Sequence, residues 1–398
     1  MTKSKIGSVL LMILKILCVC AAAAALLYYL NTLYEKDQQN VNHELDKFNS
    51  IADHEPFMIT NVGSSHGDYD FSYTDPESKG WKCFNFGMPS QTYAYDLALL
   101  KQFSGNFADG GIMFIPVSYF SFNDETVDDT EKQASQVRYY QILSPENNPD
   151  YDWFIDLTTH RLPILTGGGQ NLLTLPDLWK QDHDGVRRND IIGLPELFRP
   201  LPVQAAGEEA ATADSTAAAD STVETADSAA ADSTAMAADS AAMPTTGEAL
   251  QAYMEAIVGQ STVERYKALG LERYHRHFDD KTEYFRQDRI DELKEIIQFA
   301  QSKNITPVLV TTPFMVYYTE NIDTAWYDQF YITVDGICKD TGVQYYDYGR
   351  DDRFQYTFGY FADCDHLNEA GRAYFQSVLQ TDIPAYQQLL AAGPDSLK

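Results

Sequence analysis

Runs of apolar residues along the chain alternate with stretches in which apolar residues recur at helical spacing. The short continuous runs predict buried strands, at residues 56–63, 111–117, 305–312 and 343–346. Recurrence at helical spacing predicts helices with one buried face, at residues 90–103, 286–303, 323–338 and 369–379. Strands that alternate with helices imply a three-layer α/β domain whose central sheet is mainly parallel and covered on both faces.

The N-terminal region has a different pattern, with one long apolar run. Residues 16–34 contain no charged side chain, and residues 6–30 contain only Lys15. A helix of roughly 20 such residues spans a hydrocarbon core of about 30 Å. Lysines precede the run and Glu35 follows it, so we expect a membrane anchor at residues 1–34 with a cytoplasmic N-terminus. A cleaved signal peptide is the alternative, because the alanines at 21–25 resemble a cleavage region. The bulky residues after them favour an uncleaved anchor.

The remaining chain is predicted to hold one interrupted domain. Residues 35–50 are polar and are expected to form a juxtamembrane spacer. The two parts of the α/β domain are assigned to residues 51–203 and 249–390. Between them, residues 204–248 repeat Ala-Asp-Ser at irregular intervals and contain no aromatic residue. Such a segment has almost nothing to bury, so a disordered insertion is predicted.

Charge and cysteine content exclude several classes of function. The formal net charge is −29, and residues 204–247 account for eight acidic side chains and no basic ones, which leaves −21 elsewhere. An acidic domain of this kind is not expected to bind nucleic acid. Only Cys83, Cys338 and Cys364 lie outside the anchor, so at most one disulfide can form there. No C-x-x-C motif is present, and no metal or other cofactor is expected.

The stretch Gly63-Ser64-Ser65-His66-Gly67 directly follows the first predicted strand and suggests a serine nucleophile. A serine hydroxyl needs a base and an acid that orients that base. His366 is the best base, because Asp363 precedes it by three residues in a loop and can reach its Nδ1.

The other histidines are weaker candidates. They are His43, His54, His66, His160, His183, His275 and His277. His66 is adjacent to the serine, and on a tight turn it is expected to point away from it. His275 and His277 lie in a charged helical stretch two residues apart, where they face different directions and are expected to be solvated.

The order of these motifs resembles the SGNH (GDSL-type) hydrolase superfamily. Gly63-Ser64-Ser65 matches its first block, with Ser65 as the nucleophile, and Asp363 with His366 matches its last block. Asn85-Phe86-Gly87 is similar to the second block, which implies that the Gly87 amide helps to form an oxyanion hole. The third block departs from the family pattern. Its donor could be Asn123, displaced, or Ser118, or the hole could consist of the Ser65 and Gly87 amides alone.

Within that superfamily, the chain resembles membrane-tethered proteins of cell-envelope acylation, such as the D-alanyl transfer protein of teichoic acid alanylation. The resemblance implies an extracytoplasmic O-acyltransferase at a bacterial-type plasma membrane, with Ser65 carrying the acyl group to a surface glycan or polyol polymer. It also implies a multi-spanning membrane acyltransferase as partner. An esterase with the same triad and a catalytically silent glycan-binding or complex scaffold are the alternatives.

Aromatic residues follow several predicted strands or motif blocks and could stack on sugar rings. They are Tyr93, Tyr95, Tyr119, Phe120, Phe122, Tyr317 and Tyr318. A simpler interpretation assigns them to the core or to the wall of a pocket.

Overall fold

A computed structural model describes most of the chain outside the low-complexity region. The residues described are 3–39, 47–48, 51, 56–123, 136–165, 252, 255–256, 258–279, 281 and 283–397. The predicted insertion at 204–248 and most of the predicted spacer lie outside them. The chain divides into two compact units, the first comprising residues 1–200 and 269–398, the second residues 201–268.

The first unit is built on a five-stranded sheet in which every paired strand is parallel. Its order is β2 (Cys83–Asn85), β1 (Phe57–Asn61), β3 (Phe107–Pro116), β4 (Thr306–Thr311) and β5 (Gln344–Asp347). The predicted α/β class and parallel sheet are therefore confirmed. All five residues of β1 are buried, as expected for a strand covered on both faces. The edge strand β2 has only three residues and was not predicted.

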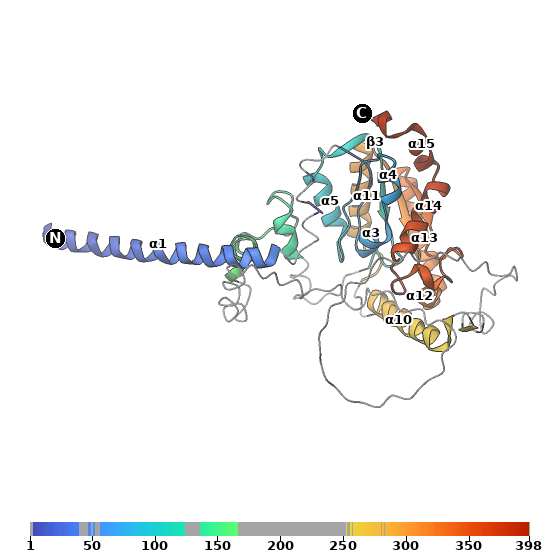
Figure 1. Cartoon of the computed structure of the whole chain (residues 1–398), viewed down its shortest axis with the longest axis horizontal. Helices are drawn as coiled ribbons and strands as arrows, with labels where there is room; N and C mark the ends of the chain where they lie inside the picture. Colours follow the sequence, from blue (N-terminus) through green and yellow to red (C-terminus); the bar gives the residue numbers. More distant parts are fainter. Residues whose placement is uncertain are drawn as a thin grey trace, which may run out of the picture. The chain divides into compact units, whose positions relative to one another are not determined.

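Helices cover both faces of the sheet (Figure 1). One layer contains α5 (Tyr93–Gln102), α11 (Gln287–Ser302) and α13 (Thr324–Thr341), and the other contains α3 (Ser65–Asp70), α14 (Glu369–Asp382) and α15 (Pro384–Ala392). The predicted helices at 90–103, 286–303, 323–338 and 369–379 correspond to α5, α11, α13 and α14. On α11, Leu293, Ile296, Ile297 and Ala300 form the buried stripe.

After the N-terminal helix, the other helices of the described chain are short, except for α10 with 19 residues. They are α4 (Thr74–Ser78), η2 (Arg138–Gln141), α7 (Trp153–Ile155), the π-helix η3 (Asp156–Arg161), η4 (Pro163–Leu165), α10 (Gln260–Phe278), α12 (Val316–Thr319), η6 (Phe358–Tyr360) and η7 (Pro394–Leu397). The five cysteines, all of which lie in described residues, form no disulfide.

The N-terminal helix α1 (Lys3–Gln39) contains a segment long and apolar enough to cross a membrane. That segment is Ser8–Thr32, with 25 residues, or about 37 Å at 1.5 Å per residue. Its large side chains are mostly exposed rather than packed, from Val9 to Tyr29. The helix continues five residues past the predicted anchor boundary at residue 34, into the region expected to be a spacer.

Aromatic side chains dominate the core on the α14–α15 side of the sheet. Phe114 of β3 is fully buried and lies 5.7 Å from the ring of Phe71 and 5.2 Å from that of Tyr386. Phe375 of α14 packs on Phe71 in turn. These contacts join the central strand to α15 and to the chain just after α3, so they support the elements that carry the site described below.

Replacement of Phe114 by alanine is expected to lower the free energy of unfolding by about 3–5 kcal/mol, because it leaves a cavity among these rings. Chemical denaturation of the full chain in detergent measures this loss. Phe154→Ala is the matched control, since Phe154 is 58% exposed and its loss should cost no more than about 0.5 kcal/mol. Equal losses in the two variants would contradict this description of the core.

Candidate active site

The turn between β1 and α3 presents Ser65 as the first residue of a helix. Gly63 has a φ of 116°, and a Cβ there would lie 3.0 Å from the Cγ of Pro116. A residue with a side chain is therefore unfavourable for two reasons, conformation and space. The Gly63 N–H donates to the Oδ1 of Asp96 at 2.7 Å. This buried bond fixes the turn, and Ser65 itself stays partly exposed.

Close backbone approach fixes α3 against the end of β1. A Cβ on Gly67 would lie 2.3 Å from the carbonyl oxygen of Val62, so only glycine fits. The side-chain amide of Asn61 donates to the Gly67 carbonyl at 2.7 Å and to the Oδ1 of Asn85 at 3.0 Å. The helix that begins with Ser65 is thus held directly on strands β1 and β2.

The loop before α14 brings His366 to the serine. The Oδ1 of Asp363 accepts the backbone N–H groups of Asp365 and His366, at 3.0 and 2.8 Å. Asp70, the last residue of α3, accepts the N–H of Leu367 at 2.8 Å. These bonds curl the loop and attach it to the helix that carries Ser65.

Ser65, His366 and Asp363 form a continuous hydrogen-bonded chain. The Nε2 of His366 lies 2.8 Å from the Oγ of Ser65, and its Nδ1 lies 2.9 Å from the Oδ2 of Asp363. When His366 is neutral, Asp363 accepts from its Nδ1–H, and this arrangement assigns the tautomer that leaves Nε2 free to accept the serine proton. The structure brings together the three residues predicted from sequence, in the order needed for proton transfer.

Arg273 of α10 adds a buried positive charge behind this chain. Its Nη2 lies 3.0 Å from the Oδ2 of Asp363, and its Nε lies 3.3 Å from the Oδ1 of Asp365. The Arg273 side chain is only 13% exposed. One guanidinium therefore bridges two carboxylates of the same loop.

These charges shift the pKa values in opposite directions. Burial alone would raise the pKa of Asp363, but His366 and Arg273 outweigh it and hold that pKa well below its usual range. Burial would lower the pKa of His366, but Asp365 and Asp363 outweigh it and raise that pKa to about 9. At neutral pH the resting site therefore favours an imidazolium beside an ionised Asp363.

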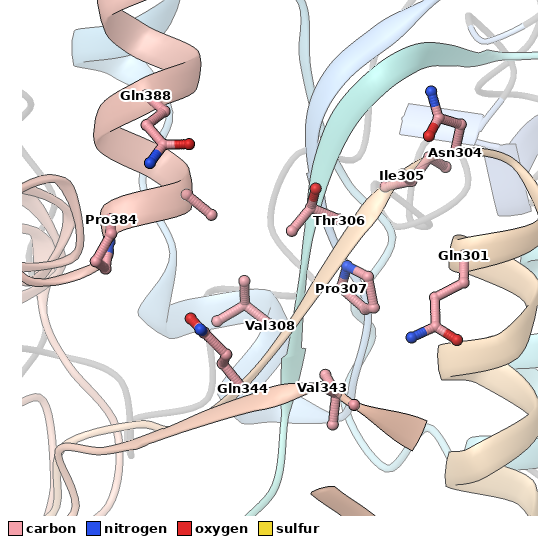
Figure 2. Close-up of a pocket in the computed structure, with 12 residues that line it drawn as sticks. Gln301, Asn304, Ile305, Thr306, Pro307, Val308, Val343, Gln344, Pro384 and Gln388 are labelled. Carbon is pink, nitrogen blue, oxygen red and sulfur yellow. The ribbon is translucent and has the colours of Figure 1, made fainter. Parts of the chain in front are cut away.

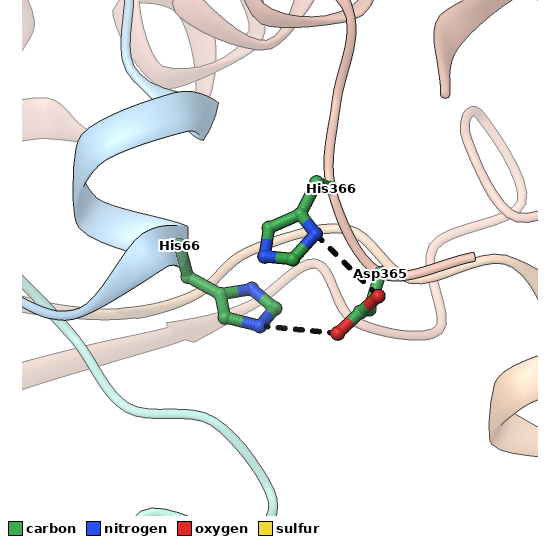
Figure 3. Close-up of side chains that lie close together, drawn as sticks. All are labelled: His66, Asp365 and His366. Atoms are coloured by element: carbon green, nitrogen blue, oxygen red, sulfur yellow. Dashed lines mark ion pairs between the residues drawn. The ribbon is translucent and has the colours of Figure 1, made fainter. Parts of the chain in front are cut away.

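Asp365 lies at the centre of a second cluster (Figure 3). It is fully buried, and neither of its side-chain oxygens has a hydrogen-bond partner among the described residues. Its Oδ1 lies 3.5 Å from the Nδ1 of His366 and its Oδ2 lies 3.8 Å from the Nε2 of His66. His277 is a third neighbour, with its Nε2 3.9 Å away. Burial raises the pKa of Asp365, and the neighbouring Asp363 raises it further, against the opposing effect of His366.

His66, Asp365 and His366 are residue types that bind divalent metals, and their donor atoms lie within 4.8 Å of one another. The surrounding charges and bonds do not fit a metal ion. Both nitrogens of His366 are engaged, with Ser65 and Asp363, and the Arg273 guanidinium already supplies the cation that balances Asp365. A metal there would displace the serine's base and lie next to a buried positive charge.

Three of the groups predicted as oxyanion donors already donate to protein acceptors in this arrangement. The N–H of Gly87 donates to the Oδ1 of Asn85 at 2.8 Å, and the side-chain amide of Asn123 donates to the carbonyl of His277 at 3.1 Å. The N–H of Ser118 donates to the Oγ of Ser121. Among the hydrogen bonds of the described residues, none uses the N–H of Ser65. Of the backbone N–H groups predicted as donors, that of Ser65 is the one without a protein acceptor among the described residues, and the side-chain amide of Asn123 keeps a second N–H.

The prediction that His277 is solvated is wrong. Its side chain is only 14% exposed, its Nδ1 lies 2.8 Å from the Tyr318 hydroxyl, and its ring stacks on Phe120 at 3.8 Å. Burial lowers its pKa well below the ordinary value. His275, two residues earlier, is 53% exposed, as expected. α10 therefore turns one of the two histidines toward the site.

His66, expected from its place on the turn to point away from Ser65, is buried within the site. Its Nδ1 lies 3.0 Å from the Oγ1 of Thr312, and its ring lies 5.0 Å from that of His366. The aromatic residues considered for sugar contact are mostly buried. Tyr93, Tyr95, Tyr119, Phe122, Tyr317 and Tyr318 are at most 7% exposed. They form the core and the walls around the site, as the simpler interpretation predicts.

A pocket of about 470 Å³ lies elsewhere on the sheet (Figure 2). Thr306 and Pro307 of β4 and Gln344 of β5 line it, so it opens at the amino ends of these strands. The residues of the Ser65 site follow the carboxyl ends of strands, where ligands of open parallel sheets bind. No charged or metal-binding side chain lines the pocket, and we assign no chemistry to it.

No protein-family model matches this chain, and no curated protein matches it.

Asp365→Asn is expected to lower the pKa of His366, because it removes one of the two neighbouring carboxylates that raise that pKa. The base must be neutral, so the reaction of Ser65 with a fluorophosphonate should accelerate as the pH rises toward about 9. In the variant, the midpoint of this increase should move to lower pH. Rates of adduct formation between pH 6 and 10 measure the midpoint.

Asp340→Asn is the control for that experiment. It removes the same charge from an exposed residue that pairs with Lys294. The midpoint should stay where it is in the wild type. A midpoint that Asp365→Asn leaves unchanged would contradict the role given to Asp365.

Proposed function

We propose that the chain is a membrane-anchored, extracytoplasmic O-acyltransferase that modifies a cell-surface polysaccharide or a teichoic-acid-like polymer through an acyl-Ser65 intermediate. The observation that carries the proposal is the hydrogen-bonded chain from Ser65 through His366 to Asp363, with the serine partly exposed and its two partners buried. An unreactive surface serine has no need of a buried base, an ionised carboxylate and a guanidinium aligned behind it.

The reaction would proceed in two half-reactions. In the first, Oγ of Ser65 attacks the carbonyl carbon of the acyl donor, and Nε2 of His366 accepts the serine proton. The bond to the donor's leaving group breaks, and that group takes the proton from His366. In the second, His366 accepts the proton of an acceptor hydroxyl, whose oxygen attacks the acyl-serine ester. The acyl group passes to the acceptor, and Ser65 regains its proton.

The resemblance to the SGNH superfamily supports the assignment of these roles, since Gly63-Ser64-Ser65 and Asp363-x-x-His366 are its first and last motif blocks. The apolar helix α1 supports tethering to a membrane. Lysines 3, 5 and 15 before or within its apolar run support a cytoplasmic N-terminus and an extracytoplasmic domain. A multi-spanning membrane acyltransferase would supply the acyl group in this proposal.

Transfer and hydrolysis share the first half-reaction and differ in whether a hydroxyl or water resolves the ester. Two features favour transfer over a free esterase. One is tethering to a membrane, and the other is that no separate carbohydrate-binding module is recognised in the sequence. The two are separated by incubating the full chain with an activated acyl ester, with and without sugar or polyol acceptors. Acylated acceptor indicates a transferase, and free acid alone indicates an esterase.

A second candidate function is a catalytically silent scaffold that binds glycan or holds a membrane complex. A specific observation favours it: the Gly87 and Asn123 groups expected to stabilise an oxyanion already donate to protein acceptors. Loss of one such donor typically costs about 10²–10³ in rate. The reactivity of Ser65 decides between the scaffold and an enzyme.

Exposure of the full chain to a fluorophosphonate is expected to give one covalent adduct, located at Ser65 by intact-mass and peptide analysis. The adduct should be absent from Ser65→Ala and retained in Ser64→Ala, a neighbouring serine that makes none of these contacts. An adduct that persists in Ser65→Ala would remove the nucleophile assignment. A chain that forms no adduct would support the scaffold.

His366→Ala and Asp363→Ala should each slow acyl turnover by about 10³-fold or more, because each breaks the relay that activates the serine. Adding His366→Ala or Asp363→Ala to Ser65→Ala should make the enzyme no slower than Ser65→Ala alone, since the three residues act as a unit. Steady-state rates with an activated acyl ester measure both effects. Losses that multiply would indicate that the residues act independently.

A further inference from the structure

A group of exposed apolar side chains lies in the segment 151–165, away from the Ser65 site in the sequence. Trp153 is 67% exposed, Phe154 58%, Leu165 50% and Tyr151 37%. The rings of Trp153 and Phe154 pack edge to face at 5.7 Å. Large aromatic side chains this exposed are uncommon on a surface that faces only water, and here several lie close together in the chain.

The segment is held in shape by its own polar contacts. The Oδ1 of Asp152 accepts the N–H groups of Phe154 and Ile155 at the start of α7. Asp156 is 4% exposed, and its carboxylate binds the Nε of Arg161 at 2.9 Å and the Tyr151 hydroxyl at 3.0 Å. These hydrogen bonds hold α7, which carries the exposed Trp153 and Phe154, in a defined conformation.

Asn31 connects this segment to the apolar helix α1. Its Nδ2 donates to the carbonyl of Arg161 at 3.1 Å, and its Oδ1 accepts the N–H of Ile164 at 3.3 Å. Asn31 is 1% exposed. Leu27 and Leu30, on the same helix face, are partly covered, whereas most of the helix before them is exposed. η4 thus packs on α1 through a two-sided amide contact.

The position of Asn31 along α1 indicates which environment surrounds the exposed side chains of residues 151–165. It lies one residue before the end of Ser8–Thr32, the segment able to cross a membrane. If α1 spans the bilayer, as the proposed function requires, Asn31 lies where the hydrocarbon core meets the headgroups. Trp and Tyr are enriched at that depth, because their rings are apolar and their polar groups remain hydrated.

We propose that residues 151–165 form a membrane-interface surface, with Trp153 and Phe154 inserted among the lipid headgroups beside the end of α1. This inference rests on the proposed membrane insertion of α1, and not on the chemistry of Ser65. The segment is hydrogen-bonded to the end of α1, so the bilayer that surrounds α1 would also reach the segment. Lipid is therefore the expected occupant of this surface.

Fluorescence quenching of Trp153 in nanodiscs tests the proposal. The full chain is reconstituted with ordinary lipids, with lipids brominated close to the headgroup, and with lipids brominated close to the chain ends. The contribution of Trp153 is the difference between the wild type and Trp153→Phe. We expect the shallow bromines to quench this contribution and the deep ones to leave most of it. A contribution that neither lipid quenches would overturn the proposal, whether water or a protein partner surrounds the residue.

Two further measurements make the result specific. Phe154→Glu should reduce the shallow quenching of Trp153, and Ile332→Glu, at a residue of α13 that is 64% exposed, should leave it unchanged. Equal effects of the two would overturn the proposal. Insertion of α1 is measured independently, by the reactivity of Cys18 and Cys20. A water-soluble maleimide should not modify these two cysteines in nanodiscs. Modified Cys18 and Cys20 would refute the membrane anchor, whereas protected cysteines with an unquenched Trp153 would refute the interface surface alone.

Discussion

The guanidinium of Arg273 lies between two carboxylates of one short loop, and the geometry of the candidate site depends on it. Asp363 and Asp365 are two residues apart and almost completely buried. Without a shared cation, two such charges would repel each other at low dielectric, and at least one would take up a proton. Arg273 contacts both. It thereby allows Asp363 to remain ionised and to fix the tautomer of His366, so that Nε2 faces Ser65.

The backbone supplies the other half of this geometry. Ser65 can lie beneath Nε2 because α3 starts almost in contact with the end of β1, and that approach excludes any side chain at Gly67. Asp70, at the other end of the same short helix, bonds to the His366 loop. The serine and the histidine are therefore positioned by the same six-residue helix, and a shift of that helix would change both positions together.

The local parts of this arrangement could be predicted from sequence. The strands and helices follow from apolar periodicity, and Ser65, Asp363 and His366 stand out because short spacings identify them. Arg273 and Asp365 did not stand out, because their roles depend on how α10 docks. The polar residues near the end of α10 suggested a solvated face, yet His277 and Arg273 point inward while His275 remains exposed. Only tertiary packing distinguishes them.

The donors expected for an oxyanion illustrate a second limit. Gly87 and Asn123 were chosen from motif positions, but whether an N–H is available depends on which acceptor lies nearest. The side chain of Asn85, two residues from Gly87, accepts the N–H of Gly87. A backbone carbonyl of α10 accepts from the side-chain amide of Asn123. The edge strand β2 was missed for a related reason. Three residues are too few to show a period, and pairing with β1 defines the strand.

The separation of Ser65 and His366 along the chain has a consequence for biosynthesis. Ser65 is made early, between α1 and the rest of the sheet, whereas His366 comes about 300 residues later, near the C-terminus. Chains emerge N-terminus first and domains fold as units. A nascent or truncated chain therefore carries Ser65 without its histidine partner. The hydrogen-bonded arrangement of Ser65, His366 and Asp363 can therefore form only after the C-terminal part of the chain has joined the sheet.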